Sequence, residues 1–199
     1  MNIIIRLTGC AVLLAAWLAG CAAAPPLTLY TLGERPLAEN IGPLPHRAAV
    51  IEVDRLILPN AADSEDILLR DGDVAERSVT GRWVSPLSNL ATSFVTSQLA
   101  MRAPSALVTD QWPTMAPDYR VMIHVSRLDV ARSGRAVIQA DWQILAHDPK
   151  RRPTRGRAQI TLSGPIATDH DVVRLETALF EHLADAINIP AGSPALVNR

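Results

Sequence analysis

The feature that most constrains the fold is a stretch of alternating apolar and polar residues between positions 119 and 162. Apolar side chains recur at every second position in 119–130 and again in 136–144, on either side of a Ser-Gly pair that is typical of a turn. A period of two indicates β-strands with one buried face. The apolar phase slips after Val125, which predicts a β-bulge. Together with a third run at 158–162, these strands predict an antiparallel sheet with one solvated face.

Two further segments carry apolar residues at three-and-four spacing, the period of an amphipathic α-helix. The first helix is predicted to begin at Ser85-Pro86, because serine can cap free N–H groups and proline is tolerated at the first helical position. It is predicted to end near Arg102. The second is predicted to begin at Thr168, with Asp171 three residues later in a near capping box.

Shorter extended segments precede the first helix. Alternation or β-branched residues predict strands at 27–32, 49–54, 67–70 and 75–82. No internal repeat and no linker long enough for a second domain is visible, so residues 27–190 are expected to form one domain. The predicted fold class is α+β, a mainly antiparallel sheet with two amphipathic helices packed on one face. The polar residues 191–199 are expected to form a flexible tail.

The first 20 residues have the parts of an export signal. Arg6 precedes an apolar core of about a dozen residues, too short for a membrane span of roughly 20. The core ends in Leu18-Ala19-Gly20-Cys21, which resembles the lipobox of bacterial lipoproteins. That resemblance implies signal-peptidase recognition of Leu18, Ala19 and Gly20, cleavage before Cys21, and lipidation of the Cys21 thiol. An ordinary cleaved export signal is the alternative.

The residue after this cysteine bears on the membrane that would receive the anchor. In the enterobacterial sorting rule an aspartate at this position retains a lipoprotein at the inner membrane, and this chain has Ala22. We therefore expect an outer-membrane lipoprotein that faces the periplasm, with the inner membrane as the less favoured alternative. Residues 21–26 would form a lipidated tether, and several buried acyl chains would make the anchoring effectively permanent.

Composition excludes several classes of protein. The formal net charge of the 199-residue chain is −1, which gives no indication of nucleic-acid binding. Of the two cysteines, Cys10 would leave with the signal, so the mature chain could form no internal disulfide. None of the five histidines forms an HExxH motif, and neither a GxSxG elbow nor a phosphate-cradling glycine loop is present. We therefore expect no enzyme activity, no catalytic residues, no metal and no cofactor.

A set of short motifs, in order along the chain, resembles the PqiC/YmbA-type lipoproteins, which are auxiliary components of ABC-type transport systems. The motifs are LYTL at 29–32, VIEVDRLILP at 50–59, ILLR at 67–70, RWVSPL at 82–87, the strand at 119–128 and QADW at 139–142. The segment 60–66 departs from the family pattern, in which a tyrosine and an arginine more often follow Pro59. No family contact is therefore carried over to residues 60–66.

The resemblance implies a role in trafficking lipid or other apolar molecules across the envelope. Members of the family work beside a permease–ATPase pair and an MCE-domain protein that forms a hydrophobic tunnel. The lipoprotein would dock that tunnel at the outer membrane and could assemble into a homo-oligomeric ring. A structural or adaptor outer-membrane lipoprotein, also without enzyme activity, is the alternative.

Two groups of residues are candidates for contacts with these partners. Arg82 and Trp83 lie in the motif that resembles the family most specifically, and are a candidate partner interface, although a tryptophan just before a helix is more often a core or hydrophobic-staple residue than a binding anchor. The densest positive charge comprises Lys150, Arg151, Arg152, Arg155 and Arg157, of which the first four are the candidates. It is a candidate contact for anionic headgroups or an acidic partner, and a solvated hairpin turn is the alternative.

Overall fold

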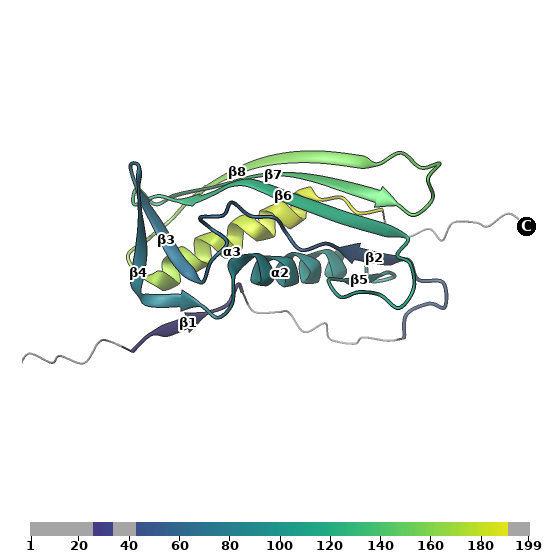
Figure 1. The fold of residues 1–199 in the computed structure, drawn as a ribbon, viewed down its shortest axis with the longest axis horizontal. Helices are drawn as coiled ribbons and strands as arrows, with labels where there is room; N and C mark the ends of the chain where they lie inside the picture. Colours follow the sequence, from purple (N-terminus) through teal and green to yellow (C-terminus); the bar gives the residue numbers. More distant parts are fainter. Residues whose placement is uncertain (1–25, 34–42, 191–199) are drawn as a thin grey trace, which may run out of the picture.

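The computed structural model describes residues 26–33 and 43–190 (Figure 1). These residues form two β-sheets and two α-helices. In chain order the elements are β1 Thr28–Tyr30, β2 Val50–Val53, β3 Asp66–Asp71, β4 Val74–Trp83, α2 Leu87–Arg102, β5 Leu107–Thr109, β6 Tyr119–Val130, β7 Arg135–Ala146, β8 Thr154–Ser163 and α3 Asp169–Ala186. The predicted α+β class is confirmed.

The strands are arranged in a five-stranded sheet of order β5-β2-β6-β7-β8 and a three-stranded sheet of order β1-β4-β3. Strands β6, β7 and β8 are antiparallel, as are β3 and β4. However, β2 is parallel to both β5 and β6, and β1 is parallel to β4. The expectation of a mainly antiparallel sheet therefore needs a correction: both sheets are mixed. Residue alternation reports the faces of a strand and carries no information on its direction.

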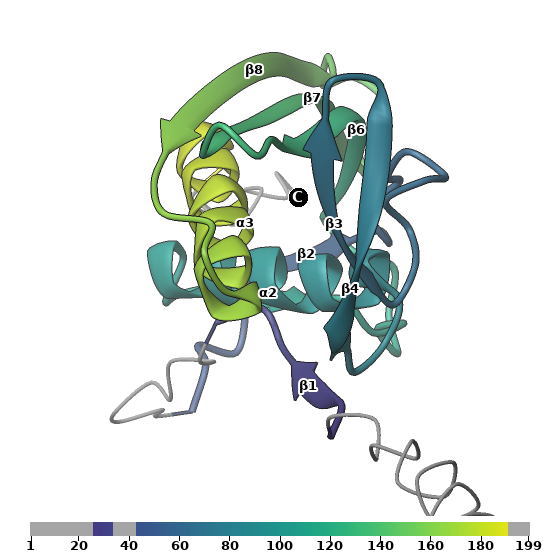
Figure 2. The same cartoon turned by 90° about the vertical axis from the view of Figure 1, so that its left-hand side faces the viewer.

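Both helices pack against one side of the five-stranded sheet. Figure 2 shows α3 beneath β7 and β8, α2 crossing below it, and the β3–β4 hairpin on the opposite side of the molecule. One apolar cluster joins these elements, and its fully buried members include Ile51, Val121, Ile138, Leu179 and Leu183. The opposite face of the sheet carries polar side chains, as the alternation predicts.

The predicted hairpin at 119–144 forms with its bulge at the expected place. The pairing of β6 with β7 shifts register between Val125 and Arg127. Gly134 in the turn has a φ of 81° and packs against the carbonyl oxygen of Gly164, so a side chain there would be strained. Gly156 on β8 lies under the ring of Trp142, and a Cβ atom at that position would lie only 2.2 Å from the ring. The third strand is longer than its apolar run suggests.

The helix starts differ in how well the sequence predicts them. The capping box of α3 forms as expected, with the Thr168 hydroxyl and the Asp171 carboxylate each bonded to the other residue's backbone N–H. The start of α2 is a correction, because Pro86 is the N-cap and no side chain of that residue caps the helix. The free N–H of Ser88 instead donates to the Asp63 carboxylate at 3.2 Å. Capping by a residue 25 positions away depends on the tertiary fold.

Helix α2 also buries polar side chains that the sequence placed on its other faces. Ser88, Thr92 and Thr96 are all buried. The Thr92 hydroxyl accepts from the backbone N–H of Leu56 at 2.9 Å and donates to the Ser88 carbonyl at 2.6 Å. The Ser88 hydroxyl accepts from the Arg55 guanidinium at 2.6 Å, so it and the Thr92 hydroxyl have partners inside the domain, whereas the Thr96 hydroxyl has none among the described residues. The three-residue strand β5, which follows this helix, is too short to show a period and was not predicted.

Candidate functional site

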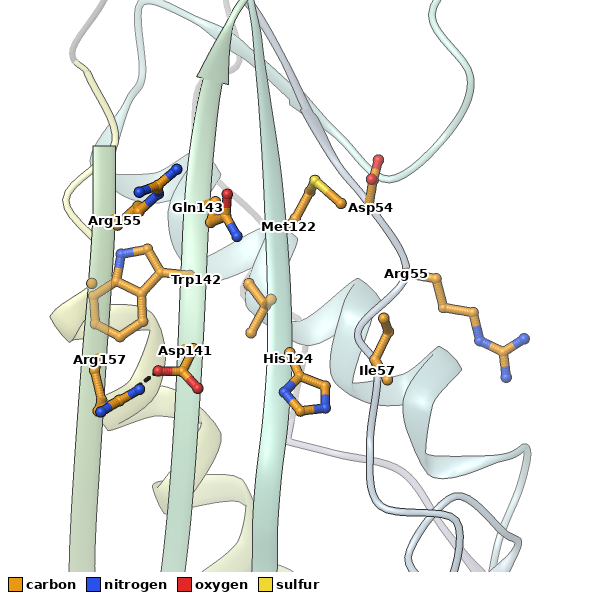
Figure 3. Close-up of a pocket in the computed structure, with 12 residues that line it drawn as sticks. Asp54, Arg55, Ile57, Met122, His124, Asp141, Trp142, Gln143, Arg155 and Arg157 are labelled. Carbon is orange, nitrogen blue, oxygen red and sulfur yellow. Dashed lines mark hydrogen bonds and ion pairs between the residues drawn. The ribbon is translucent and has the colours of Figure 1, made fainter. Parts of the chain in front are cut away.

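The solvated face of the five-stranded sheet contains a groove of about 790 Å³ (Figure 3). Its walls combine apolar side chains, Ile57 and Met122, with charged ones, among them Arg55, Arg155 and Arg157. Alternation places Met122, Arg155 and Arg157 here, because each strand residue between two core positions points away from the helices, whereas Arg55 and Ile57 come from the segment after β2. The groove therefore offers an apolar floor with cationic side chains, a surface suited to contact rather than to bond-making chemistry.

Carboxylates neutralise part of that positive charge. The Arg157 guanidinium donates to Asp141 at 2.6 Å on the neighbouring strand. Farther along the same face, Arg120 pairs with Glu52 at 2.9 Å and with Asp54 at 3.5 Å. Desolvation by burial raises the pKa of the Asp54 carboxyl above its ordinary value, although the charge of Arg120 opposes the shift. Of the arginines that line the groove, Arg157 thus pairs with a carboxylate, and Arg55 pairs with Asp63 at 3.6 Å and bonds to the Ser88 hydroxyl at 2.6 Å.

The structure separates the four basic candidates into two places. Lys150, Arg151 and Arg152 lie in the turn between β7 and β8, whereas Arg155 lies on β8 and lines the groove. All four are exposed. The Arg151 guanidinium donates to the Tyr119 hydroxyl at 2.5 Å, which ties the turn to the start of β6.

The connection from β5 to β6, residues 110–118, meets this basic turn at Asp118. The backbone N–H of His147 donates to the Asp118 carbonyl at 2.8 Å. The connection presents Trp112, which is 91% exposed, and Met115, which is 70% exposed. We name this end of the molecule, comprising the turn at 147–153 and the connection at 110–118, the basic end. Sequence reasoning missed Trp112; a tryptophan among prolines and polar residues, outside any apolar period, was the available signal.

The other candidate pair lies at the end of β4. Trp83 is 1% exposed and belongs to the core. Arg82 forms an ion pair with Asp66 at 2.8 Å and donates to the Ser78 carbonyl. Within the domain, therefore, the indole ring has no surface to offer, and Arg82 links β4 to β3. A partner contact through this pair remains a prediction.

The lipobox residues Leu18, Ala19, Gly20 and Cys21 lie outside the described residues, as do the tether up to position 25 and the tail 191–199. Lipidation therefore stays a prediction. Within residues 26–33 and 43–190 no helix is long and apolar enough to span a membrane. In the same ranges no group of three or more histidine, cysteine, aspartate or glutamate residues could hold a metal ion.

The carboxyl group of Glu176 has a raised pKa because it is buried. Glu176 on α3 is only 5% exposed, and desolvation raises the pKa of its side chain from 4.5 to about 8. Between these values the folded chain keeps a proton that the unfolded chain releases, so raising the pH destabilises the folded state.

We expect the free energy of unfolding of the wild type to fall between pH 5 and pH 8 relative to that of Glu176→Gln, by about 1.4 kcal/mol for each unit of pKa shift. Urea unfolding at several pH values measures this difference, and parallel curves for the two proteins would contradict it.

Comparison with known proteins agrees with this architecture. Residues 30–188 match the family described as ABC-type transport auxiliary lipoprotein component, and the chain belongs to that family. The description is that of a transport accessory in the cell envelope rather than of an enzyme class. It confirms the resemblance to the PqiC/YmbA-type lipoproteins. No curated protein matches the chain.

Solved structures share the fold at low sequence identity. The crystal structure of an uncharacterized protein superposes with a TM-score of 0.65 at 14% identity, covering 80% of this chain and 95% of that one. A protein from Xanthomonas campestris superposes with a TM-score of 0.57, also at 14% identity, covering 79% and 90%. The PelC dodecamer of Paraburkholderia phytofirmans reaches a TM-score of 0.40 at 11% identity, covering 72% and 92%. The first two similarities establish the fold and nothing further.

Proposed function

We propose that this protein is the lipid-anchored, periplasm-facing component of an ABC-type envelope transport system, which docks an MCE-domain tunnel to the outer membrane. The match of residues 30–188 to the auxiliary lipoprotein family is the observation that carries this proposal. Lipid or another apolar molecule is the proposed cargo, and Cys21 is the proposed site of the anchor. A homo-oligomeric ring around the tunnel is part of the same proposal.

The position of the basic end supports a role in meeting a partner. In Figure 1, β1 lies near one end of the long axis, and the turn between β7 and β8 lies near the other. A tether of six residues extends about 20 Å, whereas the twelve residues of β6 extend about 40 Å. A lipid at Cys21 would thus hold the β1 end close to the membrane. The basic end would then reach toward the periplasm, so we propose an acidic surface of the MCE-domain protein as its partner.

The chemistry of the basic end suits such a contact. Exposed tryptophan and methionine are enriched in protein interfaces, and cationic side chains around them increase the rate of association with an acidic surface. Trp112 and Met115 supply the apolar contact, and Lys150 and Arg152 supply charge. Arg151 is less available, because its guanidinium bonds to the Tyr119 hydroxyl.

Reversing charge at the basic end is expected to weaken docking. The double variant Lys150→Glu/Arg152→Glu should recover about tenfold less MCE-domain partner after mild crosslinking and purification in detergent, since both attractive charges become repulsive. A matched control is Arg135→Glu/Arg174→Glu, which makes the same change in net charge at two exposed positions elsewhere on the domain. The control should recover the partner as well as the wild type does.

Three outcomes would count against this proposal. If the wild type recovers no MCE-domain protein under crosslinking, the docking role is wrong. Recovery of peptidoglycan or envelope-assembly proteins in its place would favour the structural or adaptor alternative. If both double variants lose the partner equally, net charge rather than the basic end controls the association.

A further inference from the structure

A second pocket, of about 150 Å³, lies where the β3–β4 hairpin meets β6 and the first half of α3. It is separate from the groove and from the basic end. Most of its wall is aliphatic, from Leu68, Leu87, Leu128 and Val130. A cavity of this size lined by aliphatic side chains can hold a molecule of about six to eight non-hydrogen atoms.

The pocket also contains one polar group that lacks a partner. Glu176 lines it, and the Oε2 atom of this buried side chain has no hydrogen-bond partner among the residues that the structure describes. A buried polar atom of this kind requires a partner to offset its desolvation. Because burial raises the pKa of Glu176 to about 8, its carboxyl group is protonated at pH 7 and can donate a hydrogen bond.

The other charged groups around the pocket are already paired. From β3, Arg70 donates to both carboxylate oxygens of Asp129 on β6, each at 2.5 Å. Asp66, also from β3, pairs with Arg82 at 2.8 Å and Arg77 at 3.3 Å. Helix α2 contributes only Leu87 to the wall. Since two aspartates and one arginine surround it, the pocket offers no spare cation for an anionic ligand.

We propose that this pocket binds an uncharged aliphatic molecule that carries one hydrogen-bonding oxygen, such as an alcohol or an ester, with the Glu176 carboxyl donating to that oxygen. The aliphatic wall accommodates the hydrocarbon part. A pure hydrocarbon would leave the Glu176 oxygen without a partner, and an ionised ligand would lose its hydration without a free counter-charge. This proposal does not rest on the transport role and would stand if the docking proposal failed.

The test uses the whole lipoprotein in lipid nanodiscs, with 1-hexanol as the probe. Wild type and variants are compared under the same conditions, so that partitioning of the alcohol into the bilayer cancels. Saturable shifts are expected for the methyl signals of Leu68, Leu128 and Val130, while those of Leu145 on the solvated face stay unchanged. Glu176→Leu, which keeps a similar volume and removes the hydrogen bond, should bind the alcohol roughly fivefold more weakly. Glu176→Gln, which can still donate, should retain most of the affinity.

The pH dependence supplies a second readout that a purely structural role would not produce. Above pH 8 the wild-type carboxyl loses its proton and can no longer donate, so the affinity for 2-hexanone, a probe of similar size whose oxygen can only accept, should fall as the pH is raised from 7 to 9. The affinity of Glu176→Gln should stay constant over this range. The proposal is overturned if 1-hexanol gives no saturable shift, if Glu176→Leu binds as tightly as the wild type, or if hexylamine or hexanoate binds more tightly than 1-hexanol at pH 7.

Discussion

Replacing Cys21 with serine is expected to leave an unacylated precursor that no longer fractionates with the outer membrane. The physical reason is the loss of the acyl chains, each of which contributes about 0.8 kcal/mol per buried CH₂ group to anchoring. Radiolabelled palmitate should label the wild type strongly and the variant not at all. Membrane fractionation should show the same change in the distribution of the protein.

Cys10→Ser is the matched control, because Cys10 is the other cysteine of the chain and lies within the apolar core of the proposed signal. It should be processed and labelled like the wild type. If Cys21→Ser still accumulates in the outer membrane, the lipobox interpretation is wrong, and an ordinary cleaved export signal becomes the better explanation of residues 1–20.

Replacing Trp83 with alanine is expected to cost about 3–5 kcal/mol of the free energy of unfolding. The side chain is 1% exposed and is among the largest fully buried residues of the domain. A loss of this size is a large part of the 5–15 kcal/mol that typically holds a domain together, so the variant should be partly unfolded at moderate urea concentrations. Trp83→Phe should cost less, because the ring is kept and the indole N–H, which has no partner among the described residues, is removed.

This prediction also distinguishes a core role of Trp83 from the partner interface proposed on sequence grounds. A tryptophan that served only as a binding anchor would lose partner recovery on substitution, with stability unchanged. Trp112→Ala offers the matched comparison, since Trp112 is 91% exposed and its loss should change the free energy of unfolding by less than about 0.5 kcal/mol. Equal and small effects on stability at both positions would contradict the core assignment of Trp83.

The elements that could be predicted are those whose signals are local. The hairpin from β6 to β7 follows from a period of two, and the slip after Val125 gives the bulge within two residues of its place. Helix α3 follows from its apolar stripe and from the Thr168 and Asp171 pair at its start. Strand β5 and the true cap of α2 could not be predicted, because three residues show no period and the Asp63 carboxylate arrives from a distant segment.

The candidate site, too, could be predicted from the sequence only where its signals are local. Lys150, Arg151 and Arg152 stand out as a run of charge, yet only the fold joins their turn to the connection that carries Trp112 and Met115, and only the fold places Arg155 in the groove. Glu176 gives the clearest example. In the sequence it is one acidic residue in an amphipathic helix, which is ordinarily solvated, and only the packing of β3 and β6 against α3 buries it.

By itself, the sequence determined the α+β class, the family resemblance, the strands and helices with strong periods, and the proposed anchor at Cys21. These depend on neighbouring residues, whose spacing fixes the face that each side chain occupies. The tertiary structure alone decided the parallel pairing of β2, the two mixed sheets, the burial of Trp83 and Glu176, and the basic end opposite β1. These depend on contacts between segments far apart in the chain, which no local pattern encodes.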